Sequence, residues 1–72
     1  MKLQKFVKDK RRLANLTQAE LAEKAGVGLR FVREMEQGKE TLRMDKVNQV
    51  LKLFGYELGP LEMTRDIIIN EQ

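Results

Sequence analysis

Basic side chains dominate the residues of this sequence that could bind a ligand. Residues 1–46 contain 12 Lys and Arg against 7 Asp and Glu, a net charge of +5, whereas residues 47–72 carry a net charge of −2. A basic front half followed by a mildly acidic tail indicates an anionic partner for the front half. The alternative is that these charges form the solvated surface of helices and bind nothing.

The side chains that most enzymes and metal sites require are missing from the sequence. It contains no Cys and no His, which excludes disulfides, zinc–thiolate sites and the commonest general base. It also has no Gly-rich phosphate loop and no pair of acidic residues in an obvious cleft. We therefore expect no metal, no cofactor and no enzymatic activity.

The length of the chain bounds its architecture and its assembly. With 72 residues it forms one domain, and a chain of this size buries only about 60% of the surface that its unfolded form exposes. Because disulfides and metal are excluded, oligomerisation remains to stabilise so small a core, and we expect a homodimer. No apolar stretch is long enough to span a membrane and the N-terminus shows no signal peptide, so we expect a cytoplasmic protein without a membrane partner.

Apolar spacing and helix-end signals predict four helices. The strongest local signal is Thr17-Gln18-Ala19-Glu20, a capping box that starts a helix at Gln18. Leu16 and Leu21 occupy the two positions of a hydrophobic staple around that start. The predicted helices run from Leu3 to Ala14, from Gln18 to Gly26, from Leu29 to about Gln37 and from about Met44 to Phe54.

The spacing also predicts which side chains form the core. Val32 and Met35 should point inward from the third helix, and Val27 should fill the corner between the second and third helices. The inward face of the fourth helix should consist of Val47, Val50, Leu51 and Phe54.

The segment after Gly55 has a different pattern. Its apolar residues surround Gly59-Pro60, and the β-branched run Ile67-Ile68-Ile69 follows. One or two short strands are expected here, and since an isolated strand needs a partner, a second copy of the chain is the simplest one. We therefore divide the chain into a helical domain, residues 1–55, and a dimerisation strand or tail, residues 56–72. The expected dimer contacts are Tyr56, Leu58, Leu61 and Met63.

Two short helices joined by a Gly-containing turn, within the basic half of the chain, describe a helix-turn-helix. In this motif the N-terminus of the first helix attracts a phosphate, and the second helix presents polar side chains to the major groove of DNA. Arg30 and Arg33 face outward from the second helix of the motif, which is the third predicted helix of the chain, and could each bind guanine O6 and N7. Leu29, on the same helix, could touch a thymine methyl. Glu34 could accept a hydrogen bond from cytosine N4. The alternative is that Arg30 and Glu34 form only an i,i+4 surface pair.

The residues of this motif carry a family resemblance. The run Thr17-Gln18-Ala19-Glu20-Leu21-Ala22-Glu23-Lys24-Ala25-Gly26-Val27, followed by Glu36-Gln37-Gly38-Lys39, resembles the lambda-repressor/Cro (Xre-type) DNA-binding family. The resemblance covers about residues 5–55 and implies an all-α, four-helix fold of the lambda-repressor type. Within the family, Arg30-Phe31-Val32, the loop Gly38-Lys39-Glu40-Thr41 and the short tail are most similar to HipB-type antitoxins.

The resemblance implies a role for each matching position. Gln18 corresponds to a glutamine that contacts phosphate and braces the third helix, and Arg11 and Glu36 correspond to a buried ion pair between the first and third helices. Gly28 and Leu29 depart from the family, in which Ser, Thr or Lys and then Gln are frequent at these two positions. The positions implied to read bases are Gly28, Leu29, Arg30, Arg33 and Glu34. Those implied to contact DNA phosphates are Thr17, Gln18, Gln37, Lys39 and Arg43, of which Lys39 and Arg43 are alternatively ordinary loop charges.

The resemblance implies a homodimeric, sequence-specific repressor that binds a palindromic operator in double-stranded DNA. A HipB-type member would autorepress a toxin–antitoxin operon and neutralise a HipA-type Ser/Thr kinase toxin. One alternative is a stand-alone or phage-type regulator without a toxin partner. Another is a protein-interaction module that binds through its tail, although the basic outer face of the third helix argues against it.

Overall fold

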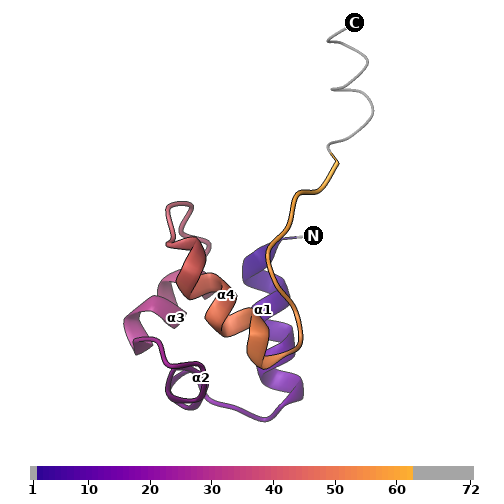
Figure 1. Ribbon diagram of the computed structural model, residues 1–72. Helices are drawn as coiled ribbons and strands as arrows, with labels where there is room; N and C mark the ends of the chain where they lie inside the picture. Colours follow the sequence, from indigo (N-terminus) through magenta and orange to yellow (C-terminus); the bar gives the residue numbers. More distant parts are fainter. Residues whose placement is uncertain (1, 63–72) are drawn as a thin grey trace, which may run out of the picture.

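The computed structural model describes residues 2–62, and within that range it contains four helices and no strand (Figure 1). The helical prediction is confirmed, and each helix ends one residue before its predicted last residue, because that residue is the C-cap. The helices are α1 (Leu3–Leu13), α2 (Gln18–Ala25), α3 (Leu29–Glu36) and α4 (Met44–Leu53).

The start of α2 has the geometry that the capping box predicts. The Thr17 hydroxyl oxygen accepts a hydrogen bond from the Glu20 amide at 3.1 Å, and a Glu20 carboxylate oxygen accepts one from the Thr17 amide at 2.8 Å. Two amides that the helix itself cannot satisfy are thereby paired. The helix ends where Gly26 takes a left-handed conformation, with φ of 76°. Both ends of α2 are therefore set by local sequence.

The core lies where the four helices meet, and every helix contributes to it. Helix α2 packs against both α3 and α4, and α1 packs against α3. Val32 and Met35 are buried as predicted, whereas Phe54 is only half-buried at the edge of the core. The buried hydrophobic residues are Val7, Leu21, Ala22, Val32, Met35, Val47, Val50 and Leu51.

The segment after α4 does not form the strand that the sequence analysis expected. Residues 56–62 run irregularly away from α4 past α1 (Figure 1), with no regular structure. The Tyr56 ring packs edge-on against Phe6 of its own chain at 4.8 Å between centroids, and the Leu58 amide donates to Asn48 Oδ1 at 2.7 Å. No other strand lies within the described residues to offer a ladder, so the expectation of a strand is wrong for residues 56–62 of the single chain.

The four predicted dimer contacts have different positions in the structure. Tyr56 and Leu58 already pack against their own chain, whereas Leu61 is 87% exposed. Met63, like Ile67-Ile68-Ile69, lies outside the described residues. None of the described helices is long and apolar enough to cross a membrane.

Candidate nucleic-acid interface

The turn between α2 and α3 fixes the direction in which α3 presents its outer face. Gly26 turns the chain, and the Val27 amide donates to the Ala22 carbonyl at 3.0 Å. Val27 is half-buried against the core, so it fills the corner between the two helices as predicted. Gly28 is the N-cap of α3 in an extended conformation, with φ of −76° and ψ of 151°. The start of α3 is therefore anchored by packing and by backbone contacts.

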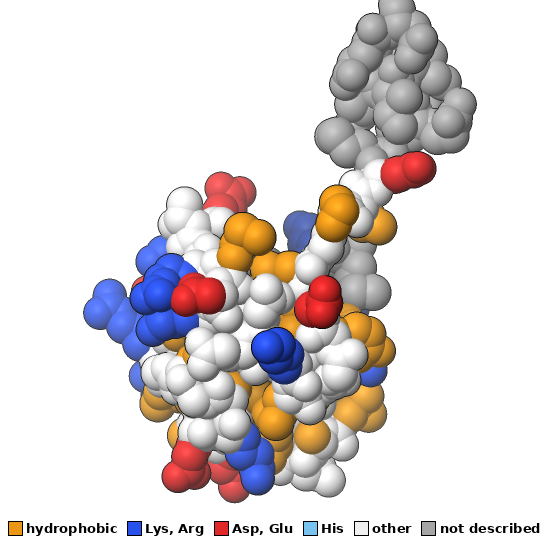
Figure 2. Space-filling view, in the orientation of Figure 1, with side chains coloured by type: hydrophobic (Ala, Val, Ile, Leu, Met, Phe, Trp, Pro, Cys, Tyr) orange, Lys and Arg blue, Asp and Glu red, His pale blue; other side chains and the backbone are white. Residues whose placement is uncertain are grey.

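The outer face of α3 presents two guanidinium groups to solvent. Arg30 and Arg33 are exposed, and the Arg30 side chain is 91% exposed. Leu29 and Phe31 pack partly against the core, which limits what Leu29 can offer to a thymine methyl. A Cβ added at Gly28 would meet nothing within 4 Å, so the face is open at that position. Figure 2 shows Lys and Arg side chains gathered at the left, over α3, with acidic side chains close by.

Glu34 lies between two of the predicted DNA-contacting cations. One carboxylate oxygen is 3.4 Å from Arg30 Nε and the other is 3.4 Å from Lys39 Nζ. The i,i+4 surface pair suggested by the sequence is therefore present, and an exposed pair of this kind contributes about 0–1 kcal/mol. Within the described part of the chain, Arg33 makes no ion pair.

The loop after α3 carries the other predicted phosphate contacts. Gln37 is exposed at the C-cap of α3, and Gly38 takes a left-handed conformation with φ of 86°. The Lys39 amide donates to the Glu34 carbonyl at 3.0 Å, which holds the start of the loop against α3. Lys39, at the start of the loop, therefore lies beside the outer face of α3.

Arg43 lies at the N-cap of α4 and pairs with Asp45. Its Nη2 is 2.7 Å and its Nε is 3.2 Å from the two carboxylate oxygens of Asp45. The hydrogen bonds from Arg43 hold the pKa of the Asp45 carboxyl below its usual range. Both side chains are exposed, so Arg43 is available to a phosphate only in competition with Asp45.

The N-terminus of α2 combines an exposed threonine with a glutamine that reaches α3. The Thr17 hydroxyl oxygen is used by the helix cap, while Gln18 is half-buried. Gln18 Nε2 donates to Glu36 Oε1 at 3.1 Å. Gln18 thus connects the amides at the start of α2, where an anion binds favourably, to the end of α3.

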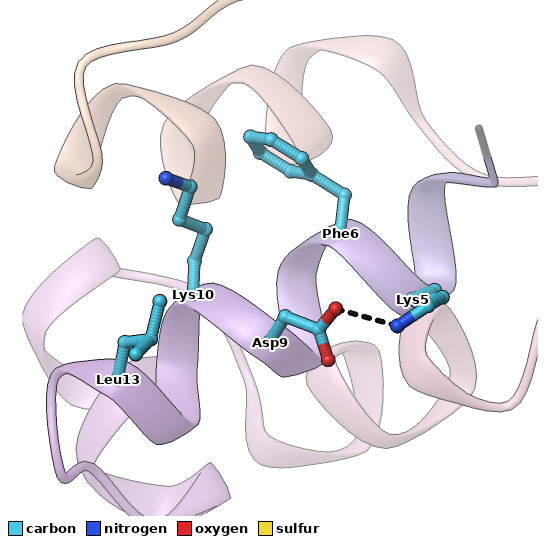
Figure 3. Close-up of a pocket in the computed structure, with 5 residues that line it drawn as sticks. All are labelled: Lys5, Phe6, Asp9, Lys10 and Leu13. Carbon is cyan, nitrogen blue, oxygen red and sulfur yellow. Dashed lines mark hydrogen bonds and ion pairs between the residues drawn. The ribbon is translucent and has the colours of Figure 1, made fainter.

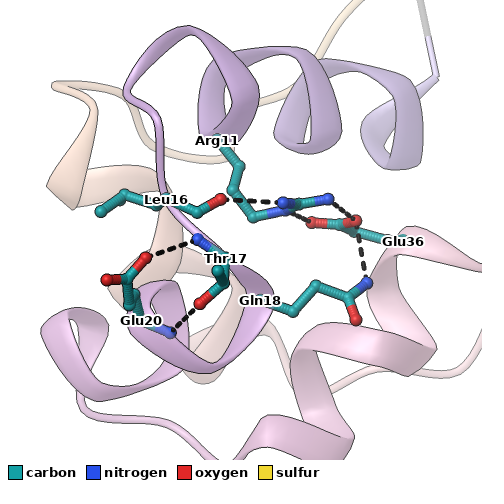
Figure 4. Close-up of polar contacts among 6 residues, drawn as sticks. All are labelled: Arg11, Leu16, Thr17, Gln18, Glu20 and Glu36. Carbon is teal, nitrogen blue, oxygen red and sulfur yellow. Dashed lines mark hydrogen bonds and ion pairs between the residues drawn. The ribbon is translucent and has the colours of Figure 1, made fainter.

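A buried ion pair holds α1 against α3 (Figure 4). Arg11 Nε donates to one Glu36 oxygen at 2.7 Å and Arg11 Nη2 to the other at 3.0 Å. Arg11 Nη1 also donates to the Leu16 carbonyl at 2.9 Å. The side chains of Glu36 and Arg11 are only 2% and 13% exposed. Such bidentate, charge-assisted pairs fix both partners in direction as well as distance.

The environment of Glu36 shifts the pKa values of both partners. Burial alone would raise the pKa of the Glu36 carboxyl, but hydrogen bonds from Arg11 and Gln18 outweigh it and hold that pKa below its usual range. The hydrogen bond to Glu36 raises the pKa of Arg11. Glu36 therefore stays ionised at neutral pH although it is buried.

Several polar contacts were not predicted from the sequence. Asn48 anchors the segment after α4 through the Leu58 amide, and Gln49 Nε2 donates to the carbonyls of Ala25 and Gly26 at 3.4 Å. A Cβ at Gly38 would collide with the side chain of Gln4. Amide side chains at single positions give no spacing signal, so only the structure identifies these contacts.

A hollow lies on the surface of α1 (Figure 3). It has a volume of about 280 Å³ and is lined by Lys5, Phe6, Asp9, Lys10 and Leu13. Lys5 pairs with Asp9 at 2.8 Å, and Lys10 Nζ lies 5.6 Å from the centre of the Phe6 ring. Lys5 and Asp9 already pair with each other, Lys10 lies over the Phe6 and Tyr56 rings, and no cluster of metal-ligating residues occurs in residues 2–62. The face of α3 is therefore the better candidate site.

Comparison with known proteins identifies the family. The helix-turn-helix family pattern matches residues 7–61, which include α2, α3, α4 and most of α1. This chain belongs to the helix-turn-helix family. It is also 51% identical, over 51 residues, to a protein of Sinorhizobium fredii (strain NBRC 101917 / NGR234) named uncharacterized HTH-type transcriptional regulator y4mF. That match covers 71% of this chain and 67% of the relative.

Proposed function

We propose that this helix-turn-helix protein is a sequence-specific DNA-binding transcription regulator that acts as a repressor and has no catalytic activity. The observation that carries the proposal is the outer face of α3, which presents Arg30 and Arg33 to solvent on the second helix of the motif. The printed name of its Sinorhizobium relative, a transcriptional regulator, supports the same conclusion. A repressor of this kind would act in the bacterial cytoplasm, where the operator is.

The proposed binding mode places α3 in the major groove. Arg33 has no ion-pair partner within the described residues and is the first candidate to bind a guanine bidentately; Arg30 is the second, once it leaves Glu34. The N-terminus of α2, at Thr17 and Gln18, would lie against the backbone of the DNA. The remaining backbone contacts would come from Gln37, Lys39 and Arg43.

We also propose that the protein binds a palindromic operator as a homodimer. A single α3 of eight residues reaches few base pairs, whereas a dimer doubles the base and phosphate contacts and reads two half-sites about one helical turn apart. Residues 56–72 are the proposed dimer contact, with Leu61 the most exposed of the apolar side chains described there. Deleting residues 56–72 should give a monomer in sedimentation, and a truncated chain that remains a dimer would refute this role of the tail.

Two finer roles are compatible with this function. The resemblance of Arg30-Phe31-Val32 and of the loop at residues 38–41 to HipB-type antitoxins supports a role in a toxin–antitoxin operon with a HipA-type kinase. The alternative is a stand-alone or phage-type regulator. Co-expression with a HipA-type kinase, if one is encoded beside this gene, separates the two: a stable complex that inhibits the kinase is expected only of the antitoxin.

Fluorescence anisotropy tests the proposed function. A duplex selected from a random library should bind with a dissociation constant near 10⁻⁸ M, about a thousandfold more tightly than its scrambled counterpart. Arg33→Ala should cost about 1–3 kcal/mol of binding to the selected duplex and relax the preference for one base pair. Arg12→Ala, which removes an exposed arginine from α1, is the matched control and should cost far less. Equal, weak binding of both duplexes by the wild-type protein would refute the proposal.

A further inference from the structure

Glu34 is the acidic side chain on the face that the proposed function directs at DNA. Its carboxylate is 3.4 Å from Arg30 Nε on α3 and 3.4 Å from Lys39 Nζ on the following loop. Its side chain is 27% exposed, less than either cation that it meets. A carboxylate in this position repels DNA phosphates and occupies two cations that would otherwise attract them.

Each Glu34 oxygen faces a cation, Arg30 on one side and Lys39 on the other. To accept a hydrogen bond from cytosine N4, the carboxylate would have to share one of these oxygens between the base and a cation. Because Arg30 and Lys39 both contact Glu34, a candidate guanine-reading side chain lies beside a candidate phosphate-contacting one. The carboxylate therefore limits how freely both cations move toward an arbitrary stretch of DNA backbone.

We propose that Glu34 is a positioning residue for selectivity: by holding Arg30 and Lys39 it weakens binding to non-specific DNA more than binding to the operator. This inference rests on the proposed function and concerns the same face. On non-specific DNA, the attraction of cations to phosphates supplies nearly all of the affinity, so neutralising those cations reduces that affinity most. On the operator, Arg30 exchanges the carboxylate for a guanine, and the base contact compensates for the ion pair that it leaves.

The size of the effect follows from Coulomb's law in water. A unit charge about 7 Å from a phosphate changes binding roughly two- to threefold for each phosphate that it faces. If Glu34 faces about two phosphates in the complex, the two factors multiply, and Glu34→Gln should tighten non-specific binding about three- to tenfold. Freeing one further cation should steepen the dependence of log K on log salt concentration by about one unit.

The experiment compares wild-type protein, Glu34→Gln and the control Asp9→Asn, using anisotropy with the selected duplex and with its scrambled counterpart across a salt series. Asp9→Asn removes the same charge from α1, where Asp9 pairs with Lys5. Glu34→Gln should tighten scrambled-duplex binding about three- to tenfold, steepen its salt dependence and reduce the ratio of the two affinities. Asp9→Asn should leave that ratio unchanged.

Three outcomes would overturn the inference while leaving the proposed function intact. Unchanged binding of Glu34→Gln to the scrambled duplex would show that the carboxylate does not restrain the cations. An equal effect of Asp9→Asn would mean that net charge, not position, is responsible. Weaker binding of Glu34→Gln to the selected duplex alone would make Glu34 a base-reading residue. If the wild-type protein prefers neither duplex, the proposed function fails, and this inference fails with it.

Discussion

The ion pair between Arg11 and Glu36 gives the sharpest test of how this small domain is held together. Glu36→Gln keeps the size and shape of the side chain but removes its charge. Arg11, only 13% exposed, would then lack a counterion and keep only neutral hydrogen-bond acceptors, the Leu16 carbonyl and the oxygen of the new amide. Removing one partner of a buried pair leaves an uncompensated buried charge, which typically costs about 3–5 kcal/mol.

The expected loss is large compared with the stability of the whole domain. A chain of 72 residues has a free energy of unfolding of about 4–11 kcal/mol on the usual per-residue scale. We expect Glu36→Gln to lower that free energy by about 3 kcal/mol, the lower end of the range, because Arg11 retains the Leu16 carbonyl and some contact with water. The variant would retain about 1–8 kcal/mol of unfolding free energy, and at the lower end of that range it would be only marginally folded at 25 °C.

Urea denaturation followed by far-ultraviolet circular dichroism measures this loss. The double variant Arg11→Met/Glu36→Leu removes both charges and should be more stable than Glu36→Gln, since apolar side chains of similar volume can replace a buried pair at little cost. Asp9→Asn, which breaks the exposed Lys5–Asp9 pair, should leave the urea midpoint nearly unchanged. A loss below about 1 kcal/mol for Glu36→Gln, within the range of a surface pair, would refute the reasoning.

The other predictions concern pH, helix ends and one close approach. Folding lowers the pKa of Glu36, so its contribution to stability is present above its unfolded pKa of about 4.3 and is lost as the pH falls through the folded pKa. Urea midpoints measured from pH 7 down to about pH 2 should therefore fall on the acid side for the wild type. The fall should be smaller for Glu36→Gln, which has no carboxyl to protonate at this position. Thr17→Ala should lower the free energy of unfolding by about 1 kcal/mol by opening the capping box, and Thr17→Ser should restore most of it in the same assay. Gly38→Ala should lower the thermal midpoint, because alanine would have to adopt a left-handed φ of 86°. The end of the flexible Gln4 side chain can move away from the new methyl group at little cost, so Gln4→Ala should restore little of the loss. Gly28→Ser should raise the thermal midpoint, since it adds a capping hydroxyl in open space at an allowed φ, and an unchanged midpoint would show that α3 needs no side-chain cap.

The parts of the fold that could be predicted are those encoded by neighbouring residues. The capping box at Thr17 and Glu20 and the glycine at position 26 act over three or four residues, so the sequence alone predicts where α2 begins and ends. The inward faces of α3 and α4 follow from helical spacing in the same way. The ends of all four helices were accordingly placed within one residue.

The parts that could not be predicted depend on residues that lie far apart or on a second chain. The apolar pattern of the tail predicts a strand, but a strand needs a partner, and in the single chain Tyr56 packs on Phe6 while Asn48 accepts a hydrogen bond from the Leu58 amide. The pairing of Arg30 with Glu34 follows from i,i+4 spacing, whereas the approach of Lys39 to the same carboxylate depends on the turn at Gly38. The pattern of local spacing contains no information on the contacts of Tyr56 and Asn48 or on the approach of Lys39 to Glu34.

The polar contacts around Glu36 connect stability to the proposed recognition of DNA. One Glu36 oxygen accepts hydrogen bonds from both Arg11 and Gln18, so the same carboxylate joins α1, the start of α2 and the end of α3. A phosphate bound at the N-terminus of α2 would therefore be held in a fixed relation to the base-reading face of α3. Loss of the carboxylate would loosen that relation even in molecules that remain folded. Glu36→Gln should consequently lose more affinity for a selected duplex than for a scrambled one, since only base reading requires α3 to keep its orientation.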